Sequence, residues 1–442
     1  MGVERLMTLL IISPDYASHL FPLATLGTAW QQAGERVVVA SGPVTADIVA
    51  AFGFERVNLQ LGRGSNPGTI RAEAQPAGED DALRGFFDAT RRGMVETLRF
   101  QAEARSSDLL WNPVEIARTV QRLIEEVQPD HVIVDHLAFS ARLGLITAGI
   151  RHADVVLGHP SALPVGTEVY GYPPAWPAVF RPDAGELAAL HHLCESVRDS
   201  FTAQWNAALL ELDPEAAPSV DAFQEAGDVL LLNYPAELHS ADRSAQLPEH
   251  AFLGSAVRTE ATDAEVEAWL AAGDVPVVYV SFGSFLSVRG DVLERVATAL
   301  NPLGVRVALA TGSTDPAALG PMPPSWLVRD FLPQVRLLDH AVLAVSHGGN
   351  NSVTEAMTAG VPLLVLPFST DQFAGAAALD DAGFGETLDP NLATVEQLRA
   401  AIVRLLALSG ESRERLERLG ISLSGGSGPR RAFETLTRMT VS

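Results

Sequence analysis

The sequence predicts an α/β protein built from two blocks of alternating strands and helices. In the first block, short apolar runs that suit buried strands alternate with segments whose apolar residues recur at helical spacing. The same alternation starts again at "VPVVYVSFGS" (275–284), after a connector without a regular pattern that follows residue 235. Such alternation indicates βαβ units and parallel sheets. We therefore expect a ligand site at the carboxyl ends of the strands, in the cleft between the blocks.

The individual elements follow from these patterns. Strands are expected in the first block at 6–13, 36–42, 131–135, 153–159 and 228–235, with a helix at 20–34. Strands are expected in the second block at 275–284, 305–313, 341–347 and 361–368, with helices at 291–301 and 351–360. The segments 63–110 and 160–225 are less regular. The second of them is rich in Pro, Gly and aromatic residues around "YGYPPAWP", which suits either an ordinary surface loop or a substrate-facing wall.

Composition narrows the class of protein. The chain has 442 residues, of which 47% are hydrophobic and 19% are charged, so it contains enough apolar residues for more than one core. Its formal net charge is −23. A protein this acidic has no general basic face for nucleic acid and would not dock on anionic lipid by charge. We expect neither partner, and we expect an acidic surface that mainly serves solubility.

Cysteine usage and hydropathy bear on the compartment. Cys194 is the only cysteine, so an intrachain disulfide and a cysteine-based zinc site are excluded. No uninterrupted apolar run reaches about 18 residues, and the short apolar run near the start suits a first strand better than a signal peptide. We expect a cytoplasmic protein without stable membrane insertion, as a monomer or a homodimer.

The most informative stretch is "SHGGNNSVTEAMTAGVPLLVLPFSTDQ" (346–372). A strand delivers His347, two glycines allow a tight turn, and a helix begins near Asn351 and Ser352. The free N–H groups and positive dipole at a helix start suit a phosphate. Glu355 follows on the same face of the first turn, and an acid at that place suits the hydroxyl groups of a ribose.

A second loop is expected to reach the same ligand. "VSFGS" ends a strand with Gly283 and Ser284, so a diphosphate lying between the two loops would be held without a metal. No cluster of acids with hard-cation spacing lies near either loop. Small residues between a strand and a helix are nevertheless common in any α/β protein, and one such loop alone is a weak signal.

Three segments together resemble the donor-binding signature of family 1 glycosyltransferases: "FLPQVRLLDH" (331–340), "SHGGNNSVTE" and "PFSTDQ". The resemblance is tight over about 331–376 and extends over the whole chain in architecture. It implies the GT-B fold, in which two Rossmann-like domains face each other across a cleft. It also implies an inverting, metal-independent enzyme of the bacterial natural-product type. Its co-substrate would be a nucleotide sugar, and no other cofactor is expected.

The resemblance assigns roles to individual residues. Phe331 would stack on the base and Gln334 would contact base or ribose, whereas Asp371 and Gln372 would grip the sugar hydroxyls. His347 would hold the diphosphate and Glu355 the ribose. The full set of donor-binding residues is Ser284, Phe331, Leu332, Gln334, His347, Gly349, Asn351, Ser352, Glu355, Asp371 and Gln372.

The signature also shows departures. Phe331 and Asn350 stand where the plant pattern has tryptophans, and Gly375 replaces a frequent asparagine. These differences leave UDP and dTDP both open as the donor nucleotide. The Asp-Gln ending favours a hexose with intact hydroxyls, so UDP-glucose is expected and a dTDP-deoxysugar is the alternative.

A catalytic base is expected in the first block. His19, Pro22 and Leu23 match the family pattern H-x-x-P-L in the loop after the first strand, although a lone histidine there would more often be a local helix-entry residue. A neutral imidazole can take a proton from a hydroxyl, and a carboxylate on its other nitrogen improves it. Asp135, at the end of a strand, is the expected partner. Asp130 and Asp15 are the competitors.

Domain boundaries and the acceptor complete the expectations. We expect an acceptor-binding Rossmann-like domain at 1–245, a nucleotide-sugar-binding domain at 246–420, and a last helix at 421–442 that packs back on the first domain. The aromatic segments 86–94 and 160–180 would line a pocket for a small aromatic or polyketide-like acceptor, but core packing would use the same residues. Two other functions on this fold are a sugar-nucleotide epimerase and a non-catalytic nucleotide-sugar-binding partner protein.

Overall fold

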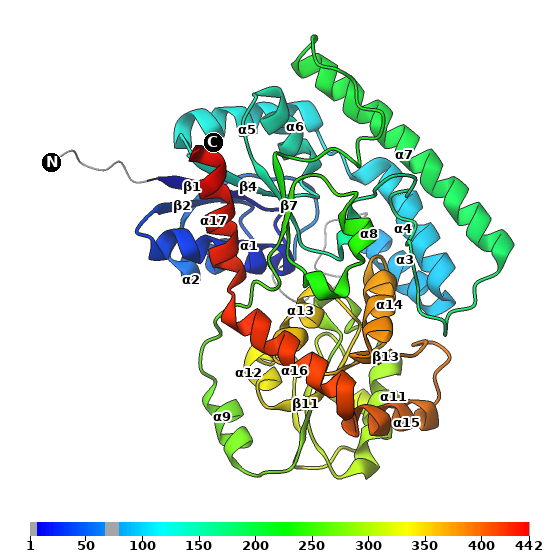
Figure 1. The fold of residues 1–442 in the computed structure, drawn as a ribbon. Coiled ribbons are helices and arrows are strands. Elements are labelled where there is room, and N and C mark those ends of the chain that lie inside the picture. Colours follow the sequence, from blue (N-terminus) through cyan, green and yellow to red (C-terminus); the bar gives the residue numbers. More distant parts are fainter. Residues whose placement is uncertain (1–6, 67–78, 442) are drawn as a thin grey trace.

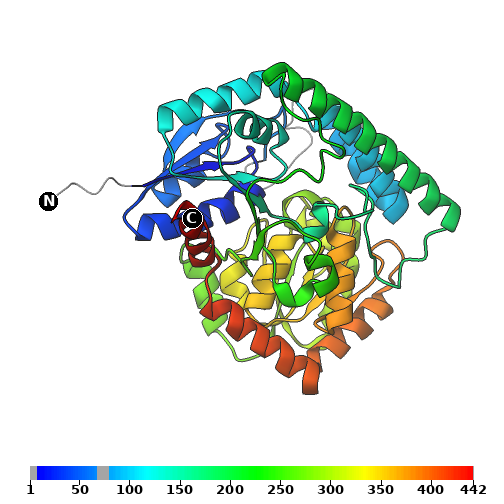
Figure 2. The same ribbon diagram turned by 45° about the horizontal axis from the view of Figure 1, so that its top comes forward.

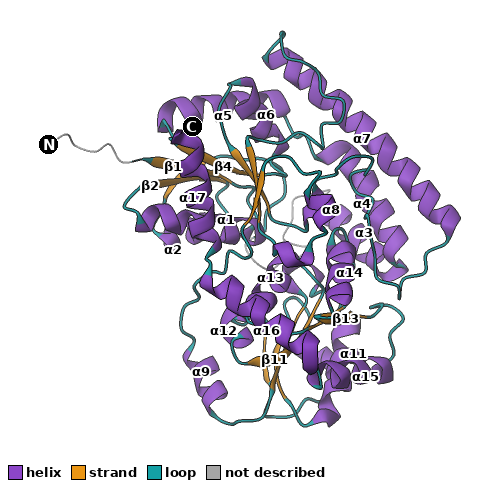
Figure 3. Cartoon of the chain, in the orientation of Figure 1, coloured by secondary structure: helices purple, strands orange, loops and turns teal. Residues whose placement is uncertain are grey.

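The fold is known here from a computed structural model that describes residues 7–66 and 79–441 (Figure 1). Each half of the molecule contains a sheet enclosed by helices, and the two halves are stacked along the long axis of the view (Figures 1 and 3). All strand pairings in the described residues are parallel. The expectation of an α/β protein with two doubly wound, Rossmann-like domains is confirmed.

The N-terminal sheet has the strand order β3-β2-β1-β4-β5-β6-β7 within the described residues. Its strands are β1 (Thr8–Ile12), β2 (Arg36–Ser41), β3 (Glu55–Asn58), β4 (His131–Asp135), β5 (Ala153–Val156), β6 (Val229–Leu232) and β7 (His250–Phe252). Its helices are α1 (Ala17–Gln32), α2 (Ala46–Phe52), α3 (Glu79–Arg92), α4 (Met94–Asp108), α5 (Pro113–Val127), α6 (Phe139–Thr147), α7 (Ala184–Leu212) and α8 (Ala241–Ser244). The central strands are buried on both faces, which explains their continuous apolar runs.

The C-terminal sheet repeats this order as β10-β9-β8-β11-β12-β13. Its strands are β8 (Val277–Ser281), β9 (Arg306–Ala310), β10 (Leu327–Arg329), β11 (Ala341–Ser346), β12 (Leu363–Val365) and β13 (Gly385–Thr387). The helices after residue 260 are α9 (Ala264–Ala271), α10 (Gly283–Leu286), α11 (Gly290–Leu300), α12 (Gln334–Leu338), α13 (Asn350–Thr358), α14 (Gln372–Ala382), α15 (Val395–Leu406), α16 (Gly410–Gly425) and α17 (Gly428–Val441). In each sheet the order reverses beside the first strand, and α/β proteins bind ligands outside such reversal points.

Two elements show how the chain passes between the domains. Strand β7 lies beyond residue 245, yet it pairs with β6 in the N-terminal sheet because the chain completes that sheet before crossing over. Helix α17 returns and packs on α1, as the colours of the two chain ends show in Figures 1 and 2. Phe433 of α17 contacts Trp30 of α1 edge to face, with ring centroids 5.1 Å apart.

The segments that looked irregular in the sequence contain long helices. Residues 79–108 form the helical pair α3 and α4, and α7 runs for 29 residues along α4 at the outer edge of the N-terminal domain (Figures 1 and 2). Leu190, Cys194 and Val197 of α7 pack with Leu98 and Ala102 of α4. This helical layer closes one side of the cleft between the domains.

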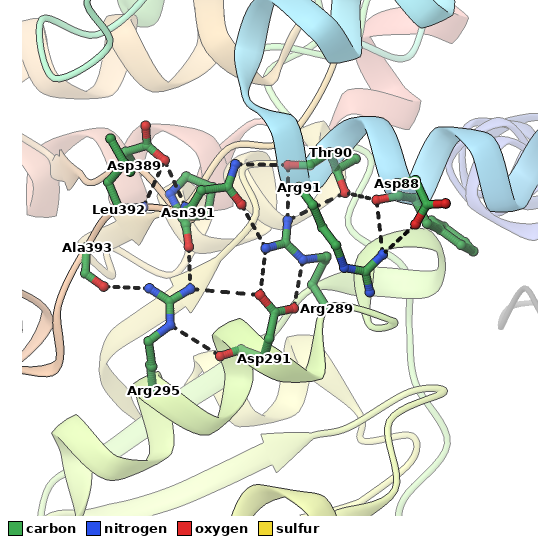
Figure 4. Close-up of polar contacts among 12 residues, drawn as sticks. Asp88, Thr90, Arg91, Arg289, Asp291, Arg295, Asp389, Asn391, Leu392 and Ala393 are labelled. Atoms are coloured by element: carbon green, nitrogen blue, oxygen red, sulfur yellow. Dashed lines mark hydrogen bonds and ion pairs between the residues drawn. The ribbon is translucent and has the colours of Figure 1, made fainter.

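A buried polar cluster joins α3 to the C-terminal domain (Figure 4). The carbonyl oxygen of Thr90, at the end of α3, accepts hydrogen bonds from Arg289 at 3.2 Å and from the side-chain amide of Asn391 at 2.9 Å. Arg289 is 1% exposed, and it also donates to Asp291 at 2.7 Å and to Asn391 at 2.8 Å. One arginine therefore holds two loops of the C-terminal domain against α3.

We predict that Arg289→Met lowers the free energy of unfolding by about 2–3 kcal/mol, because Asp291, Asn391 and the Thr90 carbonyl lose a buried charged donor. Urea denaturation followed by circular dichroism measures the change. Arg430→Met is the matched control, since the side chain of Arg430 is exposed on α17 and pairs with Glu434. Coincident denaturation curves for Arg289→Met and the wild type would contradict the prediction.

Candidate active site

The carboxyl edges of the two sheets face a single cavity of 710 Å³. From the N-terminal domain it is lined by the loops after β1, β4 and β5 together with α3 and α4. From the C-terminal domain it is lined by the loops after β8, β11 and β12. A cavity of this size between two domains has the dimensions of a small-molecule site.

His19 and Asp135 meet at the N-terminal side of this cavity. Helix α1 begins two residues before His19, and Asp135 is the last residue of the neighbouring strand β4. Nδ1 of His19 lies 2.6 Å from Oδ2 of Asp135, and the other oxygen of Asp135 accepts the N–H of Leu137 at 2.9 Å. A carboxylate only accepts, so Nδ1 carries the proton and Nε2 is left free to take one.

The interaction between His19 and Asp135 favours the protonated, positively charged form of the His19 ring. Burial lowers the pKa of His19, but the charge and hydrogen bond of Asp135 outweigh burial and raise that pKa above its ordinary value of 6.5. Burial in turn raises the pKa of Asp135, and its interaction with His19 outweighs this and lowers the pKa below its ordinary value. Asp135 therefore stays ionised and stabilises an imidazolium on His19.

The two competing aspartates point elsewhere. Asp15 accepts the N–H and hydroxyl groups of Thr45, both at 2.9 Å, at the start of α2. Asp130 accepts the N–H of Thr8 at 2.8 Å, at the opposite edge of the sheet. Among the three candidates the structure brings only Asp135 to His19.

His136 is a cavity residue that the sequence analysis missed. It follows Asp135 directly, is 3% exposed and lines the cavity. Within the described residues neither of its ring nitrogens has a hydrogen-bond partner. Burial lowers its pKa to about 4, so the ring is neutral beside the His19–Asp135 pair. The one signal for His136 in the sequence was its position, because it is a second histidine directly after the expected catalytic aspartate.

On the C-terminal side His347 lies between two glycines. A Cβ atom on Gly349 would stand 2.4 Å from Nε2 of His347, and one on Gly283 would stand 2.9 Å from Cε1. Gly283 also has φ +66°, a conformation that side chains rarely adopt. The glycines of both loops are thus required for the ring to lie between the starts of α10 and α13.

His347 is poised as a neutral donor. Burial lowers its pKa to about 4, and its Nδ1 has no hydrogen-bond partner among the described residues. The free N–H groups of the first turn of α13 begin two residues further on, at Gly349 and Asn350. A phosphate bound here would satisfy both sets of donors.

Asn351 and Ser352 line the cavity as expected, but their side chains have other partners. The amide of Asn351 donates to the carbonyl oxygen of Ser18 at 3.0 Å, across the gap between the domains. The hydroxyl of Ser352 donates to Gln334 at 3.4 Å. Ser284 is the second residue of α10, and its side chain lies outside the described part of the structure.

The far end of the C-terminal side combines an exposed ring with a buried polar group. Phe331 is 61% exposed at the cavity wall, next to Leu332 and Gln334. Glu355 is absent from the described lining residues and lies behind them. It accepts hydrogen bonds from Gln334 at 2.5 Å and from Arg258 at 2.7 Å, and both of these donors line the cavity. Glu355 therefore orients two lining residues.

Asp371 and Gln372 occupy the loop after β12. Oδ2 of Asp371 accepts the N–H of His159 from the N-terminal domain at 2.6 Å. The amide oxygen of Gln372 accepts the N–H groups of Phe368 and Ser369, and its nitrogen donates to the Ser369 hydroxyl. Both residues line the cavity, but Gln372 mainly stabilises its own loop and Asp371 also links the domains.

The remaining wall is mostly apolar and belongs to the N-terminal domain. Leu83 and Phe86 of α3, Phe100 of α4, and Tyr170 and Tyr172 of the Pro- and Gly-rich segment line it. The expectation that this segment faces the cavity is met by residues 170–173, whereas Phe87 of the other aromatic segment packs into the core with Leu83.

Residues 7–66 and 79–441 contain neither a cluster of metal ligands nor a membrane-spanning helix. No group of three or more His, Cys, Asp or Glu side chains is arranged to hold a metal ion. No helix in this part of the chain is long and apolar enough to cross a membrane.

Two Rossmann-like domains that face each other across a cleft are the arrangement of the GT-B class of fold. The family of UDP-glucoronosyl and UDP-glucosyl transferases matches residues 190–413, just over half of the chain. The chain belongs to this family.

Individual relatives agree with this assignment. NDP-glycosyltransferase YjiC of Bacillus subtilis (strain 168) is 34% identical over 130 residues, which cover 29% of this chain and 33% of that protein. The chain thus spans about a third of the length of this curated relative. The structure of CalG4, the calicheamicin glycosyltransferase, superposes with a TM-score of 0.68 at 21% identity and covers 98% of both chains.

A second solved structure shares the fold to a similar extent. It is the spinosyn rhamnosyltransferase SpnG complexed with thymidine diphosphate, with a TM-score of 0.64 and 19% identity. It covers 98% of this chain and 100% of that one. At these identities the likeness of both structures shows the fold.

We predict that the two cavity histidines titrate on opposite sides of pH 6.5. His19 should titrate above 6.5 because of Asp135, and His347 at about 4 because of burial. In Asp135→Asn the pKa of His19 should fall below 6.5, because burial remains and the carboxylate charge is lost. NMR of ¹³C-labelled histidine measures both values, with His19→Gln and His347→Gln to assign the signals. An unchanged His19 pKa in Asp135→Asn would show that Asp135 does not charge the ring.

Proposed function

We propose that this protein is an inverting, metal-independent glycosyltransferase that moves glucose from UDP-glucose to a hydroxyl group of a small, largely apolar acceptor. One observation carries the proposal. The His19–Asp135 pair of one domain and, from the other, His347 between two glycines at the start of α13 line the same cavity. A transfer reaction needs this pairing, because the base must reach the acceptor while the leaving group is held on the other side.

In the donor half of the reaction, the site stabilises the negative charge of the diphosphate. The diphosphate binds against His347 and the N–H groups of the first turn of α13, with Ser284 and Ser352 as further donors. Negative charge grows on the diphosphate as its bond to the anomeric carbon breaks, and fixed donors stabilise that charge. Asp371 accepts hydrogen bonds from the sugar hydroxyls, since a carboxylate that already accepts two still has free lone pairs.

The acceptor half is general base catalysis. Nε2 of His19 takes the proton from the acceptor hydroxyl as its oxygen attacks the anomeric carbon, and Asp135 stabilises the imidazolium that forms. The attack is a single displacement through an oxocarbenium-like transition state, as in other reactions at glycosidic carbons. The configuration inverts, so an α-linked donor gives a β-glycoside.

The residues at the proposed nucleotide end of the cavity favour UDP as the donor nucleotide, with dTDP as the second candidate. Phe331 is exposed at the wall and offers a ring for the base, and the pair Gln334 and Arg258, held by Glu355, offers donors for a ribose. A ribose 2′-hydroxyl would favour UDP. The complex of SpnG with thymidine diphosphate keeps dTDP, and with it a deoxysugar donor, as the alternative.

Calorimetric titration with UDP, dTDP, UDP-glucose and dTDP-glucose tests this proposal directly. Tight binding of UDP, followed by acceptor-dependent release of UDP with neutral phenols, supports a glucosyltransferase. Tight binding of dTDP with weak binding of UDP would replace glucose by a deoxyhexose. If none of the four compounds binds, the proposal fails.

We predict that Gly349→Ala weakens binding of UDP about 10- to 100-fold, which corresponds to losing a hydrogen bond to a charged group. The added Cβ would displace the ring of His347, 2.4 Å away. Gly62→Ala is the control, because a Cβ there meets no atom within 4 Å. Equal affinity of both variants for UDP would remove His347 from the phosphate site.

We predict that His19→Ala lowers kcat about 10²- to 10⁴-fold while the affinity for the donor stays the same, because His19 acts only on the acceptor proton. Steady-state UDP release and donor calorimetry measure the two effects. His340→Ala, at an exposed histidine outside the cavity, controls for the loss of an imidazole. Transfer by His19→Ala at nearly the wild-type rate would rule out His19 as the base.

A further inference from the structure

One arginine lies in the apolar acceptor wall of the cavity. Arg105 of α4 lines the same wall as Phe86, Phe100 and Tyr172. The other arginine among the described lining residues, Arg258, belongs to the nucleotide side and pairs with Glu260 and Glu355. A guanidinium in a largely apolar wall is costly to desolvate, so its presence requires an explanation.

Aromatic stacking holds the guanidinium in place. Cζ of Arg105 lies 5.0 Å from the ring centroid of Tyr170. Tyr170 stacks on Phe223 at 3.9 Å with an angle of 5° between the rings, and Phe223 stacks on Phe201 at 4.1 Å. All three rings are buried. The planar guanidinium thus rests on a rigid column, and stacking of this kind leaves its in-plane N–H groups available.

Among the described residues, no acid pairs with Arg105. Within the described residues its guanidinium forms no ion pair and no hydrogen bond, although acidic residues outnumber basic ones by 54 to 31. Arg99 on the same helix pairs with Glu96 at 2.8 Å, and Arg243 near the same loop pairs with Glu168 at 2.7 Å. A cation placed at a cavity wall without a counter-charge suits an anion brought by the ligand.

We propose that Arg105 binds a carboxylate of the acceptor, so that the substrate class is an aromatic hydroxy acid. The inference rests on the proposed glycosyltransferase function and names its acceptor more closely. The hydroxyl of such an acceptor lies at His19, its apolar body lies along Phe86 and Phe100, and its carboxylate receives paired N–H donors from Arg105. Paired hydrogen bonds between a guanidinium and a carboxylate give both affinity and orientation.

Matched acid and ester pairs test this inference. The probes are para-hydroxycinnamic acid, hydroxyphenylpropanoic acid and hydroxynaphthoic acid, each with its methyl ester, which keeps the shape and removes the charge. Binding is followed by tryptophan fluorescence and turnover by UDP release. The wild type should bind at least one acid more tightly than its ester, and kcat/KM should show the same preference.

Variants at Arg105 separate charge from packing. Arg105→Met should lower kcat/KM for the preferred acid about 10- to 100-fold, the size of a lost hydrogen-bonded charge pair, and change the ester's value by less than about threefold. Arg105→Lys should retain part of the preference, because a lysine keeps the charge and loses the planar fork. Arg99→Met on the same helix is the control, since Arg99 lies outside the described cavity lining.

The outcomes distinguish this inference from the proposed function. If the wild type binds and glycosylates the esters as well as the acids, the proposed contact between Arg105 and an acceptor carboxylate is wrong. The same holds if Arg105→Met affects acid and ester equally. Neither result contradicts the proposed glycosyltransferase activity. If donor titration shows no nucleotide binding, the proposed function itself is wrong. Thermal unfolding of each variant shows whether a loss of activity comes from a loss of folding.

Discussion

The side chain of Asn350 makes the contact on which the geometry of the cavity depends. Its amide nitrogen donates to the carbonyl oxygens of Leu157 at 2.7 Å and Asn233 at 2.9 Å, at the carboxyl ends of two strands of the other domain. Backbone carbonyls at an interior sheet edge need donors, and here the start of α13 supplies them. The contact fixes the distance between the loop before α13 and the N-terminal sheet.

The loops that are expected to hold the donor also hold the domains together. Asn351 donates to Ser18, one residue before His19, and Asp371 accepts from His159. Gln101 of α4 accepts the N–H of Thr370, which precedes Asp371. Because the same residues face both the neighbouring domain and the cavity, occupation of the donor site and closure of the cleft are energetically linked. A ligand that binds the closed arrangement better than an open one stabilises it.

Sequence patterns predicted the parts of the fold that local chemistry determines. Central strands such as β4 (His131–Asp135) are short apolar runs with polar ends, and their ranges were predicted closely. The edge strands β3 (Glu55–Asn58) and β7 (His250–Phe252) were missed, because an edge strand is short and polar and so carries no strand signal. Helix α7 was missed because apolar residues such as Ala207 and Leu210 lie on its exposed face and obscure the period.

The candidate site likewise contains residues whose positions the sequence predicted and residues whose positions it did not. Asp135 and His347 lie at the ends of β4 and β11, and His19 lies in the first turn of α1 after β1. Their convergence on the cleft, where the carboxyl edges of the two sheets face each other, follows from topology and could be predicted. The position of Glu355 behind Gln334 and Arg258 depends on a residue 97 positions away in the chain, and no local pattern encodes it. Arg105 carries no motif, and its place over Tyr170 results from the packing of α4 against a loop 65 residues later.

The distribution of charge in the cavity follows from these positions. The chain carries a formal charge of −23, yet the side proposed to bind the phosphates presents neutral donors: a buried imidazole of low pKa and the N–H groups of α13. Neutral dipoles stabilise a charge that develops during the reaction and release the product more easily than a fixed cation would. Arg105 lies on the wall formed by the N-terminal domain, where the charge of the proposed acceptor carboxylate would not change during the reaction. Under the proposed mechanism, a fixed cation there would orient the acceptor without retaining the leaving group.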